Sequence, residues 1–522
     1  QRARNNNRTA SRITSLQKLK EYNKRVIALK KILSIILSFI CLFPSYLCSF
    51  LPSKADTDFA IEAIAAVSVS GIENGIISEK AEFDFGDADC GWFNYYGISY
   101  KSDAYMKGVI TYKLKGEQYS EEFFLEPSDG TKPFYSFIDG VLDKTKSNTL
   151  CKITLEPLDK DAAVFELVGV DVFNREVPDK NVYLQNSEYK IGVNLLWGGA
   201  LDYLEDLDSD VQAVMVDGLT KVDSDASERY GVKSVNNNVN LINRHDTGRL
   251  VQQSYYGTFD CDAYKSAMYG EHKWNYNPVQ GGNQYNESSK IVDLVVGDDY
   301  IYIKCRPLDW AKEKEFITPS YMEATYSIEN GAVHGKCRFV DFSGYPENLR
   351  EQEIPAFYCI EPFNNFVYYN GDKPWTGDAL TSEPDLIFWP DAGYPNFYSK
   401  ENWSAFTGEF EDSFGIGVYV DNEEAFLAGV FEREKTTNED PSRDGPTSYI
   451  AIVKNRIFKS FDPYQYEYYL ATGDTKEIRD TFRAIDNSGN SYSKNINVVV
   501  YTTSSNGSGS NNSTSKKSKV YY

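Results

Sequence analysis

"YKIGVNLLWGGALDYLEDLDSD", residues 189–210, is the stretch that decides the fold. Apolar residues recur on both sides of Gly198 and Gly199, and paired glycines suit the backbone angles of a tight turn between two strands. The stretch therefore predicts a strand, a Gly-Gly turn and a second strand.

The chain beyond this hairpin continues in the same manner. Three segments predict long strands joined by short Gly or Asn turns: "YMEATYSIENGAVHGKCRFVDFSG" (321–344), "IPAFYCIEPFNNFVYYNG" (354–371) and "SFGIGVYVDNEEAFLAGVF" (413–431). "YYLATGDTKEIRDTF", residues 468–482, predicts a closing strand and a short helix with Asp474 as its N-cap. We therefore expect one large antiparallel β unit over residues 185–485.

Residues 56–180 predict a separate β-sandwich in front of this unit. "KGVITYKLKGEQYSEEFFLEPSDG" (107–130) and "CKITLEPLDKDAAVFELVGVDVFN" (151–174) are short alternating strands with turns, spaced as in sandwiches. A chain of 522 residues is too long for one ordinary core, which agrees with more than one domain.

Both ends of the chain differ from its middle. In residues 1–55, a Lys/Arg-rich stretch leads into the apolar "ILSIILSFICLF" (32–43), which predicts a signal peptide or a membrane anchor and hence a secreted or cell-surface protein. Residues 486–522 predict a strand remnant and then the Ser/Asn/Gly-rich linker "SSNGSGSNNSTSKKSK". Such a tail is compatible with attachment to the cell envelope.

The charge balance narrows the ligand class. The net charge of −22 argues against a nucleic-acid partner, because phosphate would be repelled. None of the eight cysteines forms a CxxC pair, so we expect no zinc site, and we expect no other metal and no cofactor. The cysteines outside the export segment either form disulfides of unknown pairing or are small buried hydrophobes. A neutral, hydroxyl-rich ligand suits this composition.

The order strand, Gly-Gly turn, strand, polar loop and then "GR" with aromatic residues resembles the start of the galactose-mutarotase-like β-supersandwich. "EEFFLEPSDGTKPFYSFIDGVL" (121–142) resembles the accessory sandwiches of bacterial glycan-degrading enzymes. The resemblance implies an all-β protein, with an N-terminal β-sandwich followed by a large antiparallel β-supersandwich. This supersandwich occurs in sugar epimerases, glycoside hydrolases and polysaccharide lyases. Epimerase residues are not transferred, since they require paired histidines and this chain has three in total, His245, His272 and His334.

Two nearly aliphatic-free segments predict the site. "NRHDTGRLVQQSYYG" (243–257) and "EHKWNYNPVQGGNQYNESS" (271–289) combine aromatic faces with amides and charges, which suits sugar rings and their hydroxyls. An ordinary turn pinned by an Asp–Arg pair is the alternative for the first segment. The predicted glycan-contacting residues are His245, Arg249, Gln252, Tyr255, Tyr256, His272, Trp274, Asn277, Gln280 and Asn283, with Trp375 and Trp403 as outer subsites.

Carboxylates among aromatic strands are the candidates for acid–base chemistry. Glu353 precedes a buried strand, Glu323 lies in a mostly apolar one, and Asp246 is their partner or a substrate anchor. We expect an exported carbohydrate-active enzyme, a glycoside hydrolase first and a polysaccharide lyase second, the lyase using His245, Arg249 and Tyr255. The third alternative is a non-catalytic glycan-binding surface protein. The glycan itself, the stereochemistry and the oligomeric state stay open.

Overall fold

The structure is a computed structural model. It describes residues 64–142, 144–207, 240–259, 267–268, 272–312, 316–384, 386, 396–408, 413–431, 440–486 and 499–502. The chain divides into two compact units, Gln1–Ala55 and Asp56–Tyr522, and every described residue belongs to the second. The predicted signal or anchor and most of the predicted tail lie outside the described residues. Within the described ranges, no helix has the length and apolar character that a membrane crossing requires.

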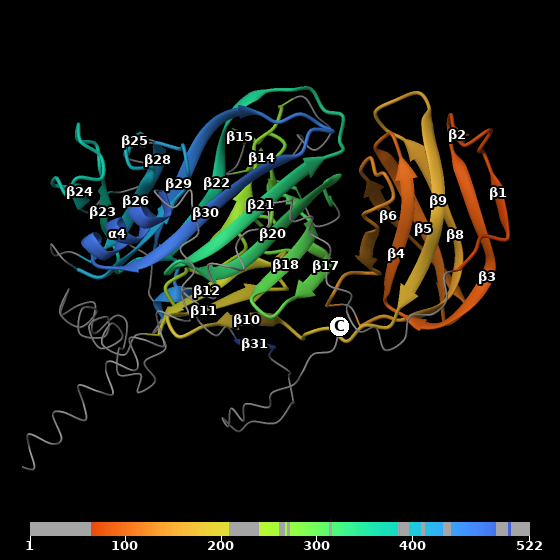
Figure 1. Ribbon diagram of the computed structural model, residues 1–522, viewed down its shortest axis with the longest axis horizontal. Helices are drawn as coiled ribbons and strands as arrows, with labels where there is room; N and C mark the ends of the chain where they lie inside the picture. Colours follow the sequence, from red (N-terminus) through yellow and green to blue (C-terminus); the bar gives the residue numbers. More distant parts are fainter. Residues whose placement is uncertain are drawn as a thin grey trace, which may run out of the picture. The chain divides into compact units, whose positions relative to one another are not determined.

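The predicted all-β class is confirmed, because antiparallel strands make up nearly all the regular structure of the described chain (Figure 1). Two sheets form the N-terminal sandwich. The five-stranded one has the order β1 (Ser68–Ser70), β3 (Ala81–Phe93), β8 (Ser147–Pro157), β5 (Met106–Leu114) and β6 (Glu117–Leu125). The four-stranded one has the order β2 (Ile76–Ile77), β9 (Ala163–Phe173), β4 (Tyr95–Ser102) and β7 (Phe134–Phe137).

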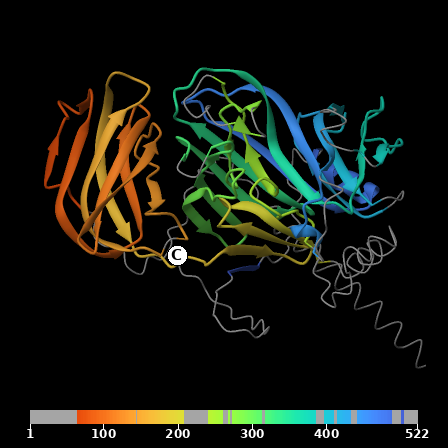
Figure 2. The same ribbon diagram turned by 180° about the vertical axis from the view of Figure 1, so that it is seen from behind.

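The larger unit also consists of two sheets, which Figure 2 shows from behind. The first, an eleven-stranded sheet, runs β25 (Asn396–Tyr398), β28 (Ala425–Phe431), β29 (Thr447–Ile457), β22 (Leu349–Ile360), β13 (Val251–Ser254), β12 (Ala200–Asp206), β11 (Tyr189–Asn194), β10 (Asn181–Gln185) and β31 (Val499–Thr502), with β16 (Pro278–Val279) and β19 (Leu308–Asp309) attached beside β13.

The second, a nine-stranded sheet, runs β17 (Lys290–Val296), β18 (Tyr300–Arg306), β20 (Ser320–Glu329), β21 (Ala332–Asp341), β30 (Tyr464–Gly473), β27 (Gly415–Tyr419), β26 (Trp403–Thr407), β23 (Asn365–Tyr368) and β24 (Thr381–Pro384). A further small pair is β14 (Ala267–Met268) with β15 (His272–Lys273). Besides strands, the described chain has the 3-10 turn η2 (Pro441–Arg443) and the helix α4 (Thr475–Asp486).

The hairpin predicted from residues 189–210 is present as β11 and β12, paired from Tyr189 with Asp206 to Asn194 with Ala200. Gly198 and Gly199 have φ angles of 56° and 71°. A Cβ on Gly198 would lie 1.8 Å from the carbonyl oxygen of Gln280. Any other residue would therefore clash, so the turn requires glycine for both its backbone angle and its close approach to the neighbouring loop.

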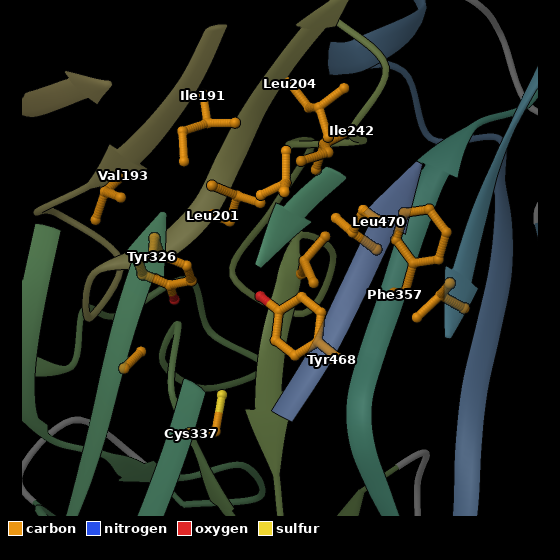
Figure 3. Close-up of a cluster of buried hydrophobic side chains, with 14 of the residues drawn as sticks. Ile191, Val193, Leu201, Leu204, Ile242, Tyr326, Cys337, Phe357, Tyr468 and Leu470 are labelled. Atoms are coloured by element: carbon orange, nitrogen blue, oxygen red, sulfur yellow. The ribbon is translucent and has the colours of Figure 1, made fainter. Parts of the chain in front are cut away.

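The large core lies between the nine- and eleven-stranded sheets, with side chains of both sheets pointing toward one another (Figure 3). In β22, Ile354, Phe357 and Cys359 enter this core, and in β20, Met322 and Ala324 do. Because side chains alternate along a strand, the residues between them point the other way. We call the surfaces that face away from the large core the outer face of the eleven-stranded sheet and the outer face of the nine-stranded sheet.

Part of the outer face of the nine-stranded sheet is covered by the N-terminal sandwich. Tyr321 and Phe342 belong to the sandwich core, and Phe342 stacks on Phe124 at 4.9 Å between ring centroids. In return, Tyr95 and Phe137 of the sandwich belong to the large core. The two predicted β units therefore exchange side chains across their boundary.

Helix α4 covers another part of this outer face. Ile478 and Phe482 pack there in a separate cluster with Trp403 and Tyr419. The predicted N-cap is confirmed, since Asp474 Oδ1 accepts a hydrogen bond from the backbone N–H of Glu477 at 2.8 Å. Five cysteines of the described part are free and buried: Cys90, Cys151, Cys305, Cys337 and Cys359.

Candidate functional site

The two polar segments predicted to form a site lie side by side. Ser254 pairs with Val279 between β13 and β16, and the backbone N–H of Gln253 donates to Oε1 of Gln280 at 3.2 Å. The hydroxyl of Thr247 donates to the carbonyl oxygen of Asn283 at 2.6 Å. These contacts join residues some thirty positions apart in the chain into one irregular layer beside β22.

Most of the amide side chains in this layer are buried and form hydrogen bonds with backbone N–H and C=O groups. Gln252 donates to the carbonyl oxygens of Thr247 and Arg249 and accepts from the N–H of Gly281. Gln280 donates to the carbonyl of Gly198, and Asn283 to that of Lys312. Irregular backbone must find such partners when it leaves water, which accounts for the amides here. Gln252, Gln280 and Asn283 therefore hold the layer together and do not present their amides to solvent.

Asp246 and Arg249 form an ion pair, as expected if this segment is an ordinary turn pinned by an Asp–Arg pair. Asp246 Oδ1 accepts the N–H groups of Gly248 and Arg249, and its Oδ2 lies 2.8 Å from Arg249 Nη1. A second guanidinium nitrogen donates to the carbonyl of Gly445. The neighbouring His245 is exposed, and its Nδ1 lies 2.9 Å from the carbonyl oxygen of Arg443. The pair closes the turn before β13.

This turn lies away from Glu353. Ser254 is the residue that pairs with Glu353 across β13 and β22. The carbonyl oxygen of Leu250, next to Arg249, accepts the backbone N–H of Tyr358, which is five residues from Glu353 along β22. Asp246 is therefore not placed as the immediate carboxylate partner of Glu353.

The two tyrosines at the end of β13 divide as strand alternation predicts. Tyr255 is buried in the large core, where its ring stacks on Phe339 at 4.1 Å. Tyr256 is half-buried and its ring lies edge-on to that of Trp274 at 6.2 Å. Tyr255 thus has the surroundings of a core residue, whereas His245, the other base of the lyase alternative, is exposed. Tyr256 faces the outer side.

Glu353 is the centre of the candidate site. It is half-buried in β22, on the outer face of the eleven-stranded sheet. The hydroxyl of Tyr449, on the adjacent strand β29, donates to Glu353 Oε1 at 2.6 Å. Tyr358 stacks on Tyr449 at 4.4 Å, and Phe431 meets Tyr449 edge-on at 5.8 Å. A carboxyl group is thus held among aromatic rings.

These surroundings decide the protonation of Glu353. Burial raises the pKa of this carboxyl above its ordinary value, and hydrogen bonds with Tyr449, Tyr256 and Ser254 offset only part of that effect. In turn, burial and the charge of Glu353 raise the pKa of Tyr256 well above that of a free tyrosine. Glu353 therefore keeps its proton to a higher pH than an exposed glutamate, as a general acid must.

Trp274 and Asn277 extend the site beyond Tyr256. Trp274 is half-buried, and its indole N–H donates to Oδ1 of Asn277 at 3.0 Å. Asn277 Nδ2 donates to the hydroxyl of Ser254 and the carbonyl of Tyr255. Its backbone N–H donates to the buried Asp309, whose pKa is raised to about 7 by burial. Asn277 thereby fixes the position of Trp274 next to the tyrosines.

The other predicted acid, Glu323, lies on the outer face of the nine-stranded sheet. Its Oε1 is 2.7 Å from Arg338 Nη1 and 3.8 Å from Lys304 Nζ, and its Oε2 accepts the hydroxyl of Tyr302. Burial works against ionisation, yet the two cations and these hydrogen bonds lower the pKa of Glu323 overall. Glu323 and Glu353 are separated by both sheets and the large core, so they cannot flank one bond.

The two predicted outer tryptophans lie at helix α4. Trp403 is fully buried, packs against Phe482, and donates its indole N–H to Glu401 at 2.9 Å. Trp375 packs partly buried against the same cluster. Both have the contacts of a structural anchor. The side chain of His272 lies outside the described part of the chain.

Tyr358 and Tyr449 are site residues that the sequence prediction missed. Tyr449, Ala451 and Val453 alternate in "TSYIAIVKNRI" (447–457), and together they pack on the outer face of the sheet. A tyrosine at the head of such an alternating strand is a weak signal by itself, because the pairing of β29 with β22 cannot be derived from either strand alone.

The described part of the chain is similar to several solved structures of sugar-processing proteins. A galactose mutarotase-like protein from Lactobacillus casei shares 9% identity at a TM-score of 0.34, covering 56% of this chain and 99% of that one. A protein from Escherichia coli that is described provisionally as an aldose 1-epimerase shares 7% identity with this chain at a TM-score of 0.31. That match covers 56% of this chain and 99% of the other one. The α-galactosidase AgaB from Geobacillus stearothermophilus shares 12% identity at a TM-score of 0.29, and the match covers 56% of this chain and 40% of that one.

This is the fold family that the strand–Gly-Gly–strand pattern resembles. At these identities and scores, nothing about activity, substrate or catalytic residues follows from the matches. No protein-family model and no curated protein sequence matches the chain.

Proposed function

We propose that this chain is a carbohydrate-active protein that binds a neutral glycan against the outer face of the eleven-stranded sheet, with Glu353 as the general acid of glycosidic-bond hydrolysis. The observation that carries the proposal is the environment of Glu353. A half-buried carboxyl with a raised pKa is held by Tyr449 and lies among aromatic side chains. Such a group can donate a proton at a pH where an exposed glutamate has lost its own.

The surroundings of Glu353 support a neutral substrate. Among the described residues, no lysine or arginine contributes to the shifted pKa of Glu353. A uronic-acid chain would bring carboxylates that need a cation beside the reacting sugar. A neutral sugar needs only an apolar face and hydrogen-bonding groups, which Trp274, Tyr256 and Tyr358 provide. This argues for hydrolysis over a lyase reaction.

The proposed chemical step uses groups of known position. Glu353 donates its proton to the glycosidic oxygen as the bond between that oxygen and the anomeric carbon breaks, while a water oxygen bonds to the anomeric carbon and loses a proton to solvent. The Tyr449 hydroxyl, which already donates to Oε1, stabilises the carboxylate that is left. Trp274 and Tyr256 hold the sugar ring in place by contact with its apolar face.

A second candidate, glycan binding without catalysis, has one observation in its favour. Hydrolysis normally needs two carboxylates, roughly 5 to 9.5 Å apart. Among the described residues, no carboxylate contributes to the shifted pKa of Glu353. A binding protein would use the same aromatic surface and require no second acid.

The experiment is a comparison of Glu353→Gln with the intact chain on a panel of neutral polysaccharides. We expect the intact chain to release reducing ends, and Glu353→Gln to lower kcat/KM roughly hundredfold or more with little change in Tm. Glu424→Gln, which alters an exposed glutamate just before β28, is the matched control and should have no effect. Wild-type rates for Glu353→Gln would contradict the proposal.

Affinity measurements separate the two candidates. If the intact chain binds a polysaccharide without releasing reducing ends, and Glu353→Gln binds equally well, the chain is a binding protein. Release of absorbing unsaturated products from acidic polysaccharides would instead favour a lyase and contradict the neutral substrate.

A further inference from the structure

A second carboxylate shares the face and the strand of Glu353. Glu351 lies two residues earlier in β22, and it pairs with Asn455 of β29 while Glu353 pairs with Val453. Between them, Gln352 points away: it is completely buried and exchanges hydrogen bonds with the backbone of Tyr256. The alternation of β22 is therefore intact here, and Glu351 and Glu353 are on the same outer face.

The spacing of the two glutamates is set by the strand. Residues two apart on one face are about 6.6 Å apart along the strand axis. Pairs of carboxylates in inverting glycosidases are roughly 6.5–9.5 Å apart, which leaves room for one water beside the sugar. The strand fixes the spacing of the two Cα atoms, and from there the two side chains can place their carboxyl groups at a separation within the inverting range.

The two glutamates have unlike surroundings, as an acid and a base need. Glu353 is half-buried and accepts the Tyr449 hydroxyl, whereas Glu351 and its cross-strand neighbour Asn455 are exposed. An exposed carboxylate has direct access to water. Two carboxyl groups whose environments differ in this way take opposite roles in proton transfer.

Apolar surface lies on both sides of this pair along the strands. On one side, Leu349 and Ile457 pair across β22 and β29, and both are exposed, to 58% and 40%. On the other side, Tyr358 and Tyr449 form the stacked aromatic pair. Tyr449 itself is buried, so a glycan lying along β22 would contact Leu349 and Ile457 on one side of the two carboxylates and the half-buried Tyr358 on the other, with its reacting bond between them.

We propose that Glu351 is the general base of the reaction in which Glu353 is the general acid, and that hydrolysis inverts the anomeric carbon. The inference rests on the proposed function. Glu351 takes a proton from water as the water oxygen bonds to the anomeric carbon, on the face opposite the leaving oxygen. Glu353 gives its proton to that leaving oxygen as the old bond breaks. Glu351 then loses the acquired proton to solvent, and Glu353 regains one.

The test compares three variants of the full chain, Glu351→Gln, Glu353→Gln and the control Glu424→Gln, on the neutral polysaccharide that the intact chain cleaves and on an aryl glycoside of the same sugar. We expect both site variants to lose about a hundredfold or more on the polysaccharide. The aryl group leaves as a phenolate and needs no general acid. We therefore expect the aryl glycoside to restore the rate of Glu353→Gln but not that of Glu351→Gln. NMR of the first product should show the inverted anomer, and the Tm of Glu351→Gln should match the intact chain.

Three outcomes overturn the inference, and they differ from a failure of the proposed function. Retention of the anomeric configuration, or wild-type rates for Glu351→Gln while Glu353→Gln is inactive, would reject Glu351 and leave Glu353 as the acid. Recovery of Glu351→Gln on the aryl glycoside would also reject its role as base. If the intact chain cleaves no polysaccharide and no aryl glycoside, the hydrolase proposal fails and the inference fails with it.

Discussion

The outer faces of the two large sheets each carry a half-buried glutamate, and their surroundings shift the two pKa values in opposite directions. On the nine-stranded sheet, Glu323 lies between Arg338 and Lys304, and its pKa is lowered. On the eleven-stranded sheet, the described residues that hold Glu353 contribute hydroxyl groups, and burial raises its pKa. Burial acts in the same direction on both, so the neighbouring cations decide the outcome.

The same contrast extends along the nine-stranded sheet. Arg338 contacts Glu126 of the N-terminal sandwich as well as Glu323, and buried His334 lies between Glu329 and Glu467. These acids have cationic partners and serve the packing of the molecule. The comparison teaches that an acid in a strand is a candidate for chemistry where the structure gives it hydrogen bonds but no counter-ion.

The largest expected effect comes from removing the cover of the nine-stranded sheet. A chain that starts at Pro178 would expose Tyr321 and Phe342 and would leave Arg306 and Arg338 without Glu122 and Glu126. We expect it to aggregate or to lack a cooperative melt in differential scanning calorimetry, because aromatic side chains bury a large apolar area. A cooperative melt at the Tm of the full chain would show that the cover is dispensable.

Arg338→Met tests the paired acids directly. The substitution keeps much of the apolar stem and leaves Glu323 and Glu126 without their shared cation, which should lower the free energy of unfolding by about 3 kcal/mol. Chemical denaturation measures this. Adding Glu323→Gln should recover part of the loss, and a loss below about 1 kcal/mol for the single variant would mean that solvent compensates these charges.

On the outer face of the nine-stranded sheet, the contribution of the acids and their cationic partners to stability should depend on pH through His334. Its pKa is raised above 6.5 by Glu329 and Glu467, although burial opposes this, and the pKa values of both glutamates are lowered from 4.5 by their hydrogen bonds to His334. The contribution of the imidazolium is fully present below pH 6.5 and is lost as the pH rises through the raised value. The contribution of the glutamates is present above pH 4.5 and is lost as the pH falls through their lowered values.

We therefore expect a plateau in Tm between those limits and a decline on either side. His334→Gln should remove the part of the decline that lies above pH 6.5. An unchanged profile for this variant would show that the imidazole is not the titrating group.

The smallest expected effect on stability is that of Tyr449→Phe, on the outer face of the eleven-stranded sheet. It removes one hydrogen bond to Glu353 and should cost about 1 kcal/mol of stability. Because that hydrogen bond favours the carboxylate, its loss should raise the pKa of Glu353 further and move the alkaline limb of the activity profile to higher pH. A shift to lower pH would mean that Tyr449 stabilises the protonated form instead.

The fold could be predicted from the sequence to a large extent because its signals are local. The Gly198–Gly199 turn, the strand alternation and the Asp474 cap are each decided by residues within a few positions. The exchange of Tyr95 and Tyr321 between the two cores depends on contacts far apart in the chain, and no local pattern announces it.

The site could be predicted only in part, for the same reason. Glu353, Tyr256 and Trp274 stand out as an acid and aromatic side chains in polar sequence. In the sequence, Gln252 and Asn283 look like glycan-binding amides. In the structure, they donate hydrogen bonds to backbone carbonyl groups of the irregular layer. Glu323 and Glu353 also look alike in sequence, since Arg338 and Tyr449 reach them from other strands.

The most direct test of the central claim is a carboxyl carbon NMR titration of the full chain, with Glu353→Gln and Glu323→Gln to assign the two resonances. We predict that Glu353 titrates above the ordinary glutamate value of 4.5 and Glu323 below it. The order of the two midpoints is the decisive result, since both groups are half-buried and only their partners differ. Equal midpoints, or a lower midpoint for Glu353 than for Glu323, would contradict the account.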